Sequence, residues 1–94
     1  MYLHVGNGET LRKRNIIGIF DLDTATVSGV TRRFIAGKEK QGLVEYGDAD
    51  LPRAFLLMDG EPEGDPRQSR IRLSRISSAV LRARAEEGEE QYGE

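Results

Sequence analysis

The sequence predicts an α+β fold: a small, mostly antiparallel sheet of about five strands with one amphipathic helix and a short C-terminal helix. Two patterns indicate strands, namely a near-continuous apolar run over residues 15–22 and an alternation of apolar and basic side chains over residues 70–75. Between them, apolar residues recur at helical spacing from Val27 onward. The chain has 94 residues, 37% of them hydrophobic, which suits one small core that self-association would help to stabilise.

The first part of the chain is predicted to form strands. Residues 2–5 alternate in character, and the Gly6-Asn7-Gly8 segment that follows contains an Asn-Gly pair, which tolerates the positive φ values of a tight hairpin turn. We therefore expect a strand, a turn and a returning strand. Residues 15–22 (NIIGIFDL) are apolar almost throughout, which is typical of a strand covered on both faces. This segment is expected to be the central strand.

An amphipathic helix is expected next. Its apolar positions at helical spacing are Val27, Val30, Phe34 and Ile35. Ser28 or Thr26 can cap its start, and Gly37 or Gly42 can end it. Residues 43–46 (LVEY) and 53–59 (RAFLLMD) then predict two strands joined by a turn through Gly47-Asp48.

The C-terminal part begins with loop composition over residues 60–69 and continues with a half-exposed strand over residues 70–75. Ser77 or Ser78 can then cap a short helix. Its expected apolar stripe consists of Ile76, Ala79, Val80 and Ala83. Residues 86–94 have too little apolar surface to order themselves, so we expect a domain over residues 1–85 and a disordered acidic tail over residues 86–94.

The charge of the chain is distributed unevenly. The formal net charge is -2, but five of the 16 acidic residues and none of the 14 basic residues lie in the last ten positions. The first 84 residues therefore carry 14 basic and 11 acidic side chains, a formal charge of +3. A basic body of this kind is compatible with a polyanionic partner, and the tail is placed to screen it or compete for it.

The composition limits the classes of function. There is no cysteine, so disulfides, thiolate zinc sites and thiol nucleophiles are excluded. No apolar stretch approaches the roughly 20 residues of a membrane-spanning helix, and the start MYLHVGNGET has no secretory pattern. We expect a cytoplasmic protein without membrane contact.

Residues for enzyme chemistry are few. His4 is the only histidine, and a lone histidine in a strand is more often structural than a ligand or base. Asp21 and Asp23 can bind a hard cation, but acids at a strand-to-helix junction more often stabilise turns and helix N-termini. The acids of the loop, Glu61, Glu63 and Asp65, suit a solvated segment. We expect a non-enzymatic protein with no catalytic residues, metal site, cofactor or small-molecule substrate.

The arginines are the stronger indication of function. Eleven of the 14 basic residues are arginine, whose side chain makes forked hydrogen bonds to phosphate and to guanine edges. The alternative is that scattered arginines pair with the acids and keep the surface soluble. Within the closing segment, Arg82 and Arg84 can also meet the acids of residues 86–90 of the same or a neighbouring protomer.

Several stretches of the chain resemble one family. The opening MYLHVGNGE, the segment NIIGIFDLD, the Val/Phe/Ile helix and the ending LSRISSAVLRARA resemble the small bacterial extracellular matrix regulatory proteins, the RemA/RemB family. The resemblance covers roughly residues 1–85 and is greatest to the RemB-like members, which share the Ile-Phe-Asp at Ile19 to Asp21 and a serine-led final helix. It implies a small α/β protomer in a ring-like homo-oligomer and, for the RemA branch, a DNA-binding transcriptional activator of biofilm matrix genes.

The chain departs from the RemA pattern at the expected DNA face. In that branch paired arginines follow a Tyr-Gly step, whereas Tyr46-Gly47 is followed here by Asp48 and Asp50, and Arg53 keeps the basic position a few residues on. A RemA-type arginine expected at the start of the central strand falls at about Asn15, beside Arg14. Asp48 and Asp50 would repel the phosphates of DNA at this face. DNA contact through a different basic face of the protein is therefore an alternative.

These observations predict a non-enzymatic oligomeric regulatory protein that binds double-stranded DNA through repeated basic patches. The expected DNA contacts are Arg12, Arg14 and Arg53 in the first place and Arg70 and Arg72 in the second. The alternative is a protein-interaction or scaffold oligomer that has lost the DNA-binding face.

Overall fold

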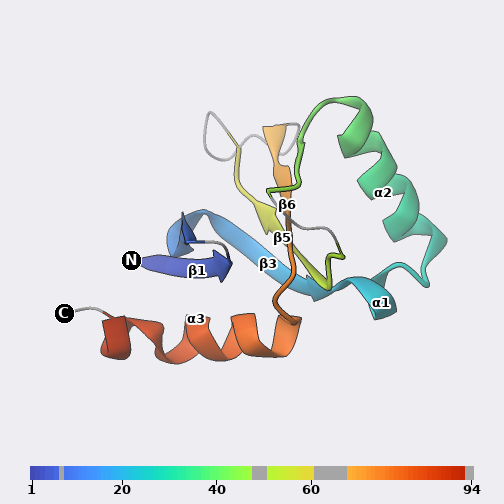
Figure 1. The fold of residues 1–94 in the computed structure, drawn as a ribbon. Helices are drawn as coiled ribbons and strands as arrows, with labels where there is room; N and C mark the ends of the chain where they lie inside the picture. The colour runs from blue at the N-terminus through green and yellow to red at the C-terminus, as the bar shows by residue number, and fades with distance from the viewer. Residues whose placement is uncertain (7, 48–50, 61–67, 93–94) are drawn as a thin grey trace.

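The computed structural model describes residues 1–94 except 7, 48–50, 61–67 and 93–94, and it has an α+β fold (Figure 1). The α+β class is thereby confirmed. In chain order, the elements are β1 (Tyr2–Gly6), β2 (Glu9–Arg12), the 3-10 turn η1 (Lys13–Asn15), β3 (Ile16–Asp21), α1 (Leu22–Ala25), α2 (Gly29–Lys40), β4 (Val44–Glu45), β5 (Ala54–Met58), β6 (Arg70–Ser74) and α3 (Ser78–Tyr92).

The first two strands form a separate antiparallel hairpin in the described structure rather than part of a single sheet. Tyr2 lies opposite Arg12 and Leu3 opposite Leu11. The strand–turn–strand prediction is confirmed, while Asn7 of the expected turn lies outside the described residues. Since side chains alternate between faces, the hairpin has a buried side and an exposed side.

The remaining described strands form a four-stranded sheet in the order β3-β5-β6-β4. The strand expected at residues 15–22 is present as β3, but its central position was wrong, because β3 lies at one edge. The interior strand β5 (AFLLM) is buried along nearly its whole length, whereas Ile17 in β3 is 58% exposed. Both segments are apolar runs, and their order depends on long-range pairing that the runs do not encode.

The strands expected at residues 43–46 and 53–59 are both present, but they are not neighbours. β4 pairs in parallel with β6, with Val44 opposite Ile71, and β5 pairs antiparallel with β3 and β6. Asp48 of the turn expected between β4 and β5 lies outside the described residues. The alternation expected at residues 70–75 is confirmed in β6, where Ile71 and Leu73 are buried and the arginines face the other way.

One side of the sheet is covered by the hairpin and α3 (Figure 1). Leu3, Leu56 and Leu81 are buried at its centre. The predicted stripe of α3 was wrong in part: Ala79, Val80 and Ala83 are exposed, and Leu81 faces the core instead. Leu81 carries the largest apolar side chain within the helix, so burying it favours this rotation.

The helix α3 is longer than the short helix expected, because it continues to Tyr92 and includes most of the residues assigned to the tail. The expected division between residues 1–85 and residues 86–94 stays a prediction. Among the described residues, no helix combines the length and apolar character needed to cross a membrane.

The other side of the sheet carries Phe55, Ile71 and Leu73 and is covered by α1 and α2. The helix α2 begins after Ser28, whose side chain caps Thr31 N, as predicted, and it is followed by Gly42 at a φ of 74°.

The expected apolar face of α2 was wrong for most of its members. Val27 lies before the helix and is 77% exposed. Of the other three residues, only Ile35 packs on the sheet, while Val30 is 68% and Phe34 41% exposed. Lys38 is buried instead, with its Nζ 5.7 Å from the centre of the Phe34 ring. The helix therefore leaves apolar surface uncovered within the described chain.

Candidate nucleic-acid interface

The exposed side of the hairpin is defined by its pairing. Tyr2 and His4 on β1 alternate with the buried residues Leu3 and Val5, and Arg12 lies directly across from Tyr2. Facing residues on one side of an antiparallel pair have Cβ atoms about 4.5–5.5 Å apart, so Tyr2 and Arg12 are immediate neighbours. We call this surface the hairpin face; its residues are Tyr2, His4, Thr10 and Arg12.

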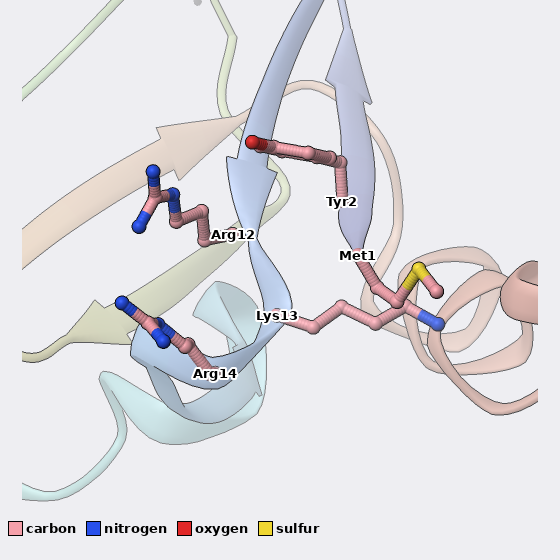
Figure 2. Close-up of a pocket in the computed structure, with 5 residues that line it drawn as sticks. All are labelled: Met1, Tyr2, Arg12, Lys13 and Arg14. Carbon is pink, nitrogen blue, oxygen red and sulfur yellow. The ribbon is translucent and has the colours of Figure 1, made fainter. Parts of the chain in front are cut away.

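The turn η1 places a second arginine beside the first. Lys13 N donates to Met1 O at 3.0 Å, and Lys13 Nζ donates to Ala85 O in α3 at 2.7 Å. The Lys13 side chain is therefore directed toward α3, and Arg12 and Arg14 on either side of it project to the opposite side (Figure 2). Both arginines are exposed.

These residues surround a hollow of about 520 Å³, lined by Met1, Tyr2, Arg12, Lys13 and Arg14. We call it the N-terminal hollow. Figure 2 shows the Tyr2 ring extending across the hairpin toward the side of Arg12, with the guanidinium of Arg14 below that of Arg12. The volume is within the range of small-ligand sites, about 300–1,000 Å³.

The acid nearest in sequence is directed away from the hairpin face. Glu9 is the only acidic residue in the described part of residues 1–12, and its carboxylate accepts a hydrogen bond from Arg72 on the buried side of the hairpin. In the described structure Arg12 itself has no hydrogen-bond or ion-pair partner. The hairpin face therefore carries the exposed guanidinium of Arg12, while the carboxylate of Glu9 lies on the other side of the hairpin.

The two arginines of β6 have different surroundings. Arg72 lies opposite Leu56 and reaches Glu9 and Glu45, with 3.8 Å between Arg72 Nη1 and Glu45 Oε1, and Arg70 Nη1 lies 3.3 Å from Glu45 Oε2. The Arg72 side chain is only 12% exposed, and burial lowers its pKa below the ordinary value. Both arginines thus face carboxylates of their own chain.

Arg53 is exposed but distant from the hairpin end. It precedes β5, where its carbonyl accepts from Leu22 N and its amide donates to Ser74 O. The other end of β5, at Met58, lies opposite Ile16, immediately after η1. The structure therefore brings Arg12 and Arg14 together and leaves Arg53 at the opposite end of the sheet.

Two arginines of α3 donate hydrogen bonds to backbone carbonyls of the strands. Arg82 Nη2 donates to Ile19 O on the edge strand β3 at 2.8 Å, and Arg84 Nη1 donates to His4 O on β1 at 3.3 Å. The pairing of Arg82 and Arg84 with the acids of residues 86–90 stays a prediction. Their bonds to strand carbonyls connect α3 to both sheets.

The candidate metal residues have an ordinary structural role where they are described. Asp21 caps α1, accepting a hydrogen bond from Thr24 N at 3.1 Å, which is the helix-start alternative rather than cation binding. Within the described ranges, no group of three or more His, Cys, Asp or Glu residues is arranged to hold a metal ion. Glu61, Glu63 and Asp65 lie outside these ranges.

Sequence reasoning missed Tyr2 as a member of the site. The pattern that identifies it is the hairpin register, in which residue 2 faces residue 12. No protein-family model matches the chain, and no curated protein matches it either.

Proposed function

We propose that this chain is a non-enzymatic, oligomeric, cytoplasmic regulatory protein that binds DNA through the hairpin face. The observation that carries this proposal is the pair of exposed arginines, Arg12 and Arg14, beside the N-terminal hollow, with Glu9 held on the other side by Arg72. Arginine is suited to phosphate because its planar fork donates two parallel hydrogen bonds.

The hairpin also has a suitable shape. A two-stranded β-ribbon fits the major groove of B-form DNA, where the other residues of the hairpin face would meet base edges while Arg12, and Arg14 beside it, contact the phosphates. The two arginines of one protomer would bind DNA only weakly. Several copies in an oligomer would raise the overall affinity, because binding of one copy increases the effective concentration of the others. Regulation of extracellular matrix genes rests on the family resemblance alone.

The test is fluorescence anisotropy of a labelled duplex across a salt series, with the oligomeric state recorded on the same sample. The double variant Arg12→Glu/Arg14→Glu is expected to weaken binding by at least about tenfold at low salt. It should also reduce the slope of log affinity against log salt by roughly 2, since each phosphate contact contributes about 0.9.

The matched control is Arg33→Glu/Lys40→Glu, which makes the same charge change on exposed positions of α2. This control should keep the salt slope of the wild type. If both double variants lose the same affinity for DNA, the loss reflects the net charge of the protein and not a contact at the hairpin. Unchanged binding by Arg12→Glu/Arg14→Glu would exclude the hairpin face as the DNA-binding surface. Arg53→Glu, measured separately, reports on the opposite end of the sheet.

A protein-interaction or scaffold oligomer is the second candidate, and the uncovered face of α2 favours it. Val30 and Phe34 of α2, with Val27 just before the helix, are exposed apolar side chains of the kind that interfaces bury. An intact oligomer that binds no DNA at low salt would select this function over the first.

A further inference from the structure

The exposed ring of Tyr2 bears on whether the hairpin binds single-stranded or double-stranded nucleic acid. Tyr2 is 54% exposed, and its ring lies on the hairpin face next to Arg12. In a duplex the faces of the bases are stacked on one another, so a tyrosine ring on a groove-binding ribbon meets only edges, sugars and phosphates. An aromatic ring gains a stacking contact most readily where a base is unpaired, because in a duplex the neighbouring bases must first be separated.

The surroundings of the ring suit the rest of a nucleotide. Arg12 is the cross-strand neighbour of Tyr2, and Arg14 projects to the same side from η1 (Figure 2). The N-terminal hollow between them has a volume of about 520 Å³, and its Lys13 is committed to Ala85 O. An aromatic platform beside a phosphate-binding arginine pair is the arrangement by which proteins hold single strands.

We infer that the N-terminal hollow binds an unpaired nucleotide, with the base stacked on the Tyr2 ring and the phosphate held by Arg12 and Arg14. The inference rests on the proposed function in using the same arginines, and it goes further by giving a single strand preference over a duplex. The same chemistry is available from a free nucleotide, and the test separates the two sources.

The experiment compares a labelled 15-nucleotide oligothymidylate with a 15-base-pair duplex, using the full chain with its affinity tag at the C-terminus because Met1 lines the hollow. The wild type is expected to bind the single strand more tightly. Tyr2→Leu should weaken single-strand binding on the order of tenfold, and Tyr2→Phe should retain it, because the ring rather than the hydroxyl stacks.

The matched control is Tyr46→Leu, since Tyr46 is also about half exposed and lies on a different part of the surface. It should leave both affinities unchanged. The chain has three tyrosines and no tryptophan, so stacking can be followed directly as quenching of tyrosine fluorescence. Tyr2→Phe should remove that quenching while keeping the affinity.

The outcomes separate the inference from the proposed function. Equal affinity for both probes, lost in Arg12→Glu/Arg14→Glu but unchanged in Tyr2→Leu, would overturn the inference and leave the proposed function standing. Absence of binding to any probe would overturn both. Tyr2-dependent binding of thymidine monophosphate without binding of the oligonucleotide would support the hollow as a nucleotide site and overturn the DNA function.

Discussion

The arginines at the hairpin end and those of β6 and α3 share one side chain but have opposite surroundings. Arg12 is exposed and, in the described structure, has no hydrogen-bond or ion-pair partner, whereas Arg72 is largely buried between Glu9 and Glu45. Arg82 and Arg84 lie between these extremes, because they donate to strand carbonyls. A count of arginines therefore overstates the charge available to a polyanion, since several already bind groups of their own chain.

The comparison also explains why the two regions depend on each other. Strand alternation places Glu9 on the buried side of the hairpin, opposite to Arg12, and Arg72 pairs with the Glu9 carboxylate there. Under the proposed function, the internal arginines help to hold the hairpin in place, and the exposed Arg12 and Arg14 contact the nucleic acid.

The largest expected effect on stability follows from Arg72→Met, which removes the charge and keeps an apolar stem. Glu9 and Glu45 would be left facing each other without the cation, and we expect the free energy of unfolding to fall by roughly 1–3 kcal/mol. Half-exposed carboxylates keep the cost below that of a fully buried pair. Urea unfolding measures it.

The control for Arg72→Met is Arg53→Met at an exposed position, for which the change in unfolding free energy should be within about 0.5 kcal/mol. Equal stability of the two variants would contradict the distinction between internal and exposed arginines.

An intermediate effect is expected from Arg82→Ala and Arg84→Ala. Each variant loses a hydrogen bond from a charged donor to a backbone carbonyl at the protein surface, and we expect roughly 0.5–1.5 kcal/mol of stability to be lost. The check is thermal unfolding alongside Arg75→Ala, an exposed arginine of the same segment. If Arg75→Ala costs as much as the other two, the carbonyl contacts contribute nothing specific.

The smallest effect concerns Tyr46, the exposed tyrosine that contrasts with Tyr2. Its hydroxyl donates a hydrogen bond to Glu39, and this bond raises the pKa of Tyr46 above its ordinary value. Because the folded-state pKa is raised, the contribution of the bond is present at neutral pH and is lost as pH rises through that pKa.

Glu39→Gln is expected to return the pKa of Tyr46 toward its ordinary value, with little change in stability at neutral pH. Ultraviolet titration of the phenols measures the change, and Tyr46→Phe identifies the transition by deleting it. A titration curve unaltered by Glu39→Gln would show that the bond does not govern the ionisation.

Local features of the fold were predictable from the sequence, and the arrangement of elements was not. The hairpin, the Ser28 cap and the alternation in β6 follow from period and turn chemistry. The order of β3 and β5 depends on pairing between distant segments. Likewise, the face that α3 buries is decided by Leu81, which the predicted stripe left out.

The candidate site likewise has a part that the sequence predicted and a part that it did not. Arg12 and Arg14 were predicted from their clustering, and the structure places them together. The partner of Arg72 was not predictable, because Glu9 is 63 residues away in sequence and no local pattern joins the two. Tyr2 was missed because an aromatic residue in an N-terminal strand is ordinary until the hairpin register sets Arg12 opposite it.

The contacts between the two ends of the chain have a consequence for the order of folding. Lys13 and Ala85 are 72 residues apart, and His4 and Arg84 are 80 apart, yet both pairs are hydrogen bonded. Contacts of such sequence separation form late, because closing the loop costs entropy before any contact is gained. The hairpin that carries Arg12 thus completes its packing only after α3 has been synthesised. A partly synthesised chain would therefore lack the packed hairpin that carries Arg12, and the hairpin would reach its final position only once α3 is present.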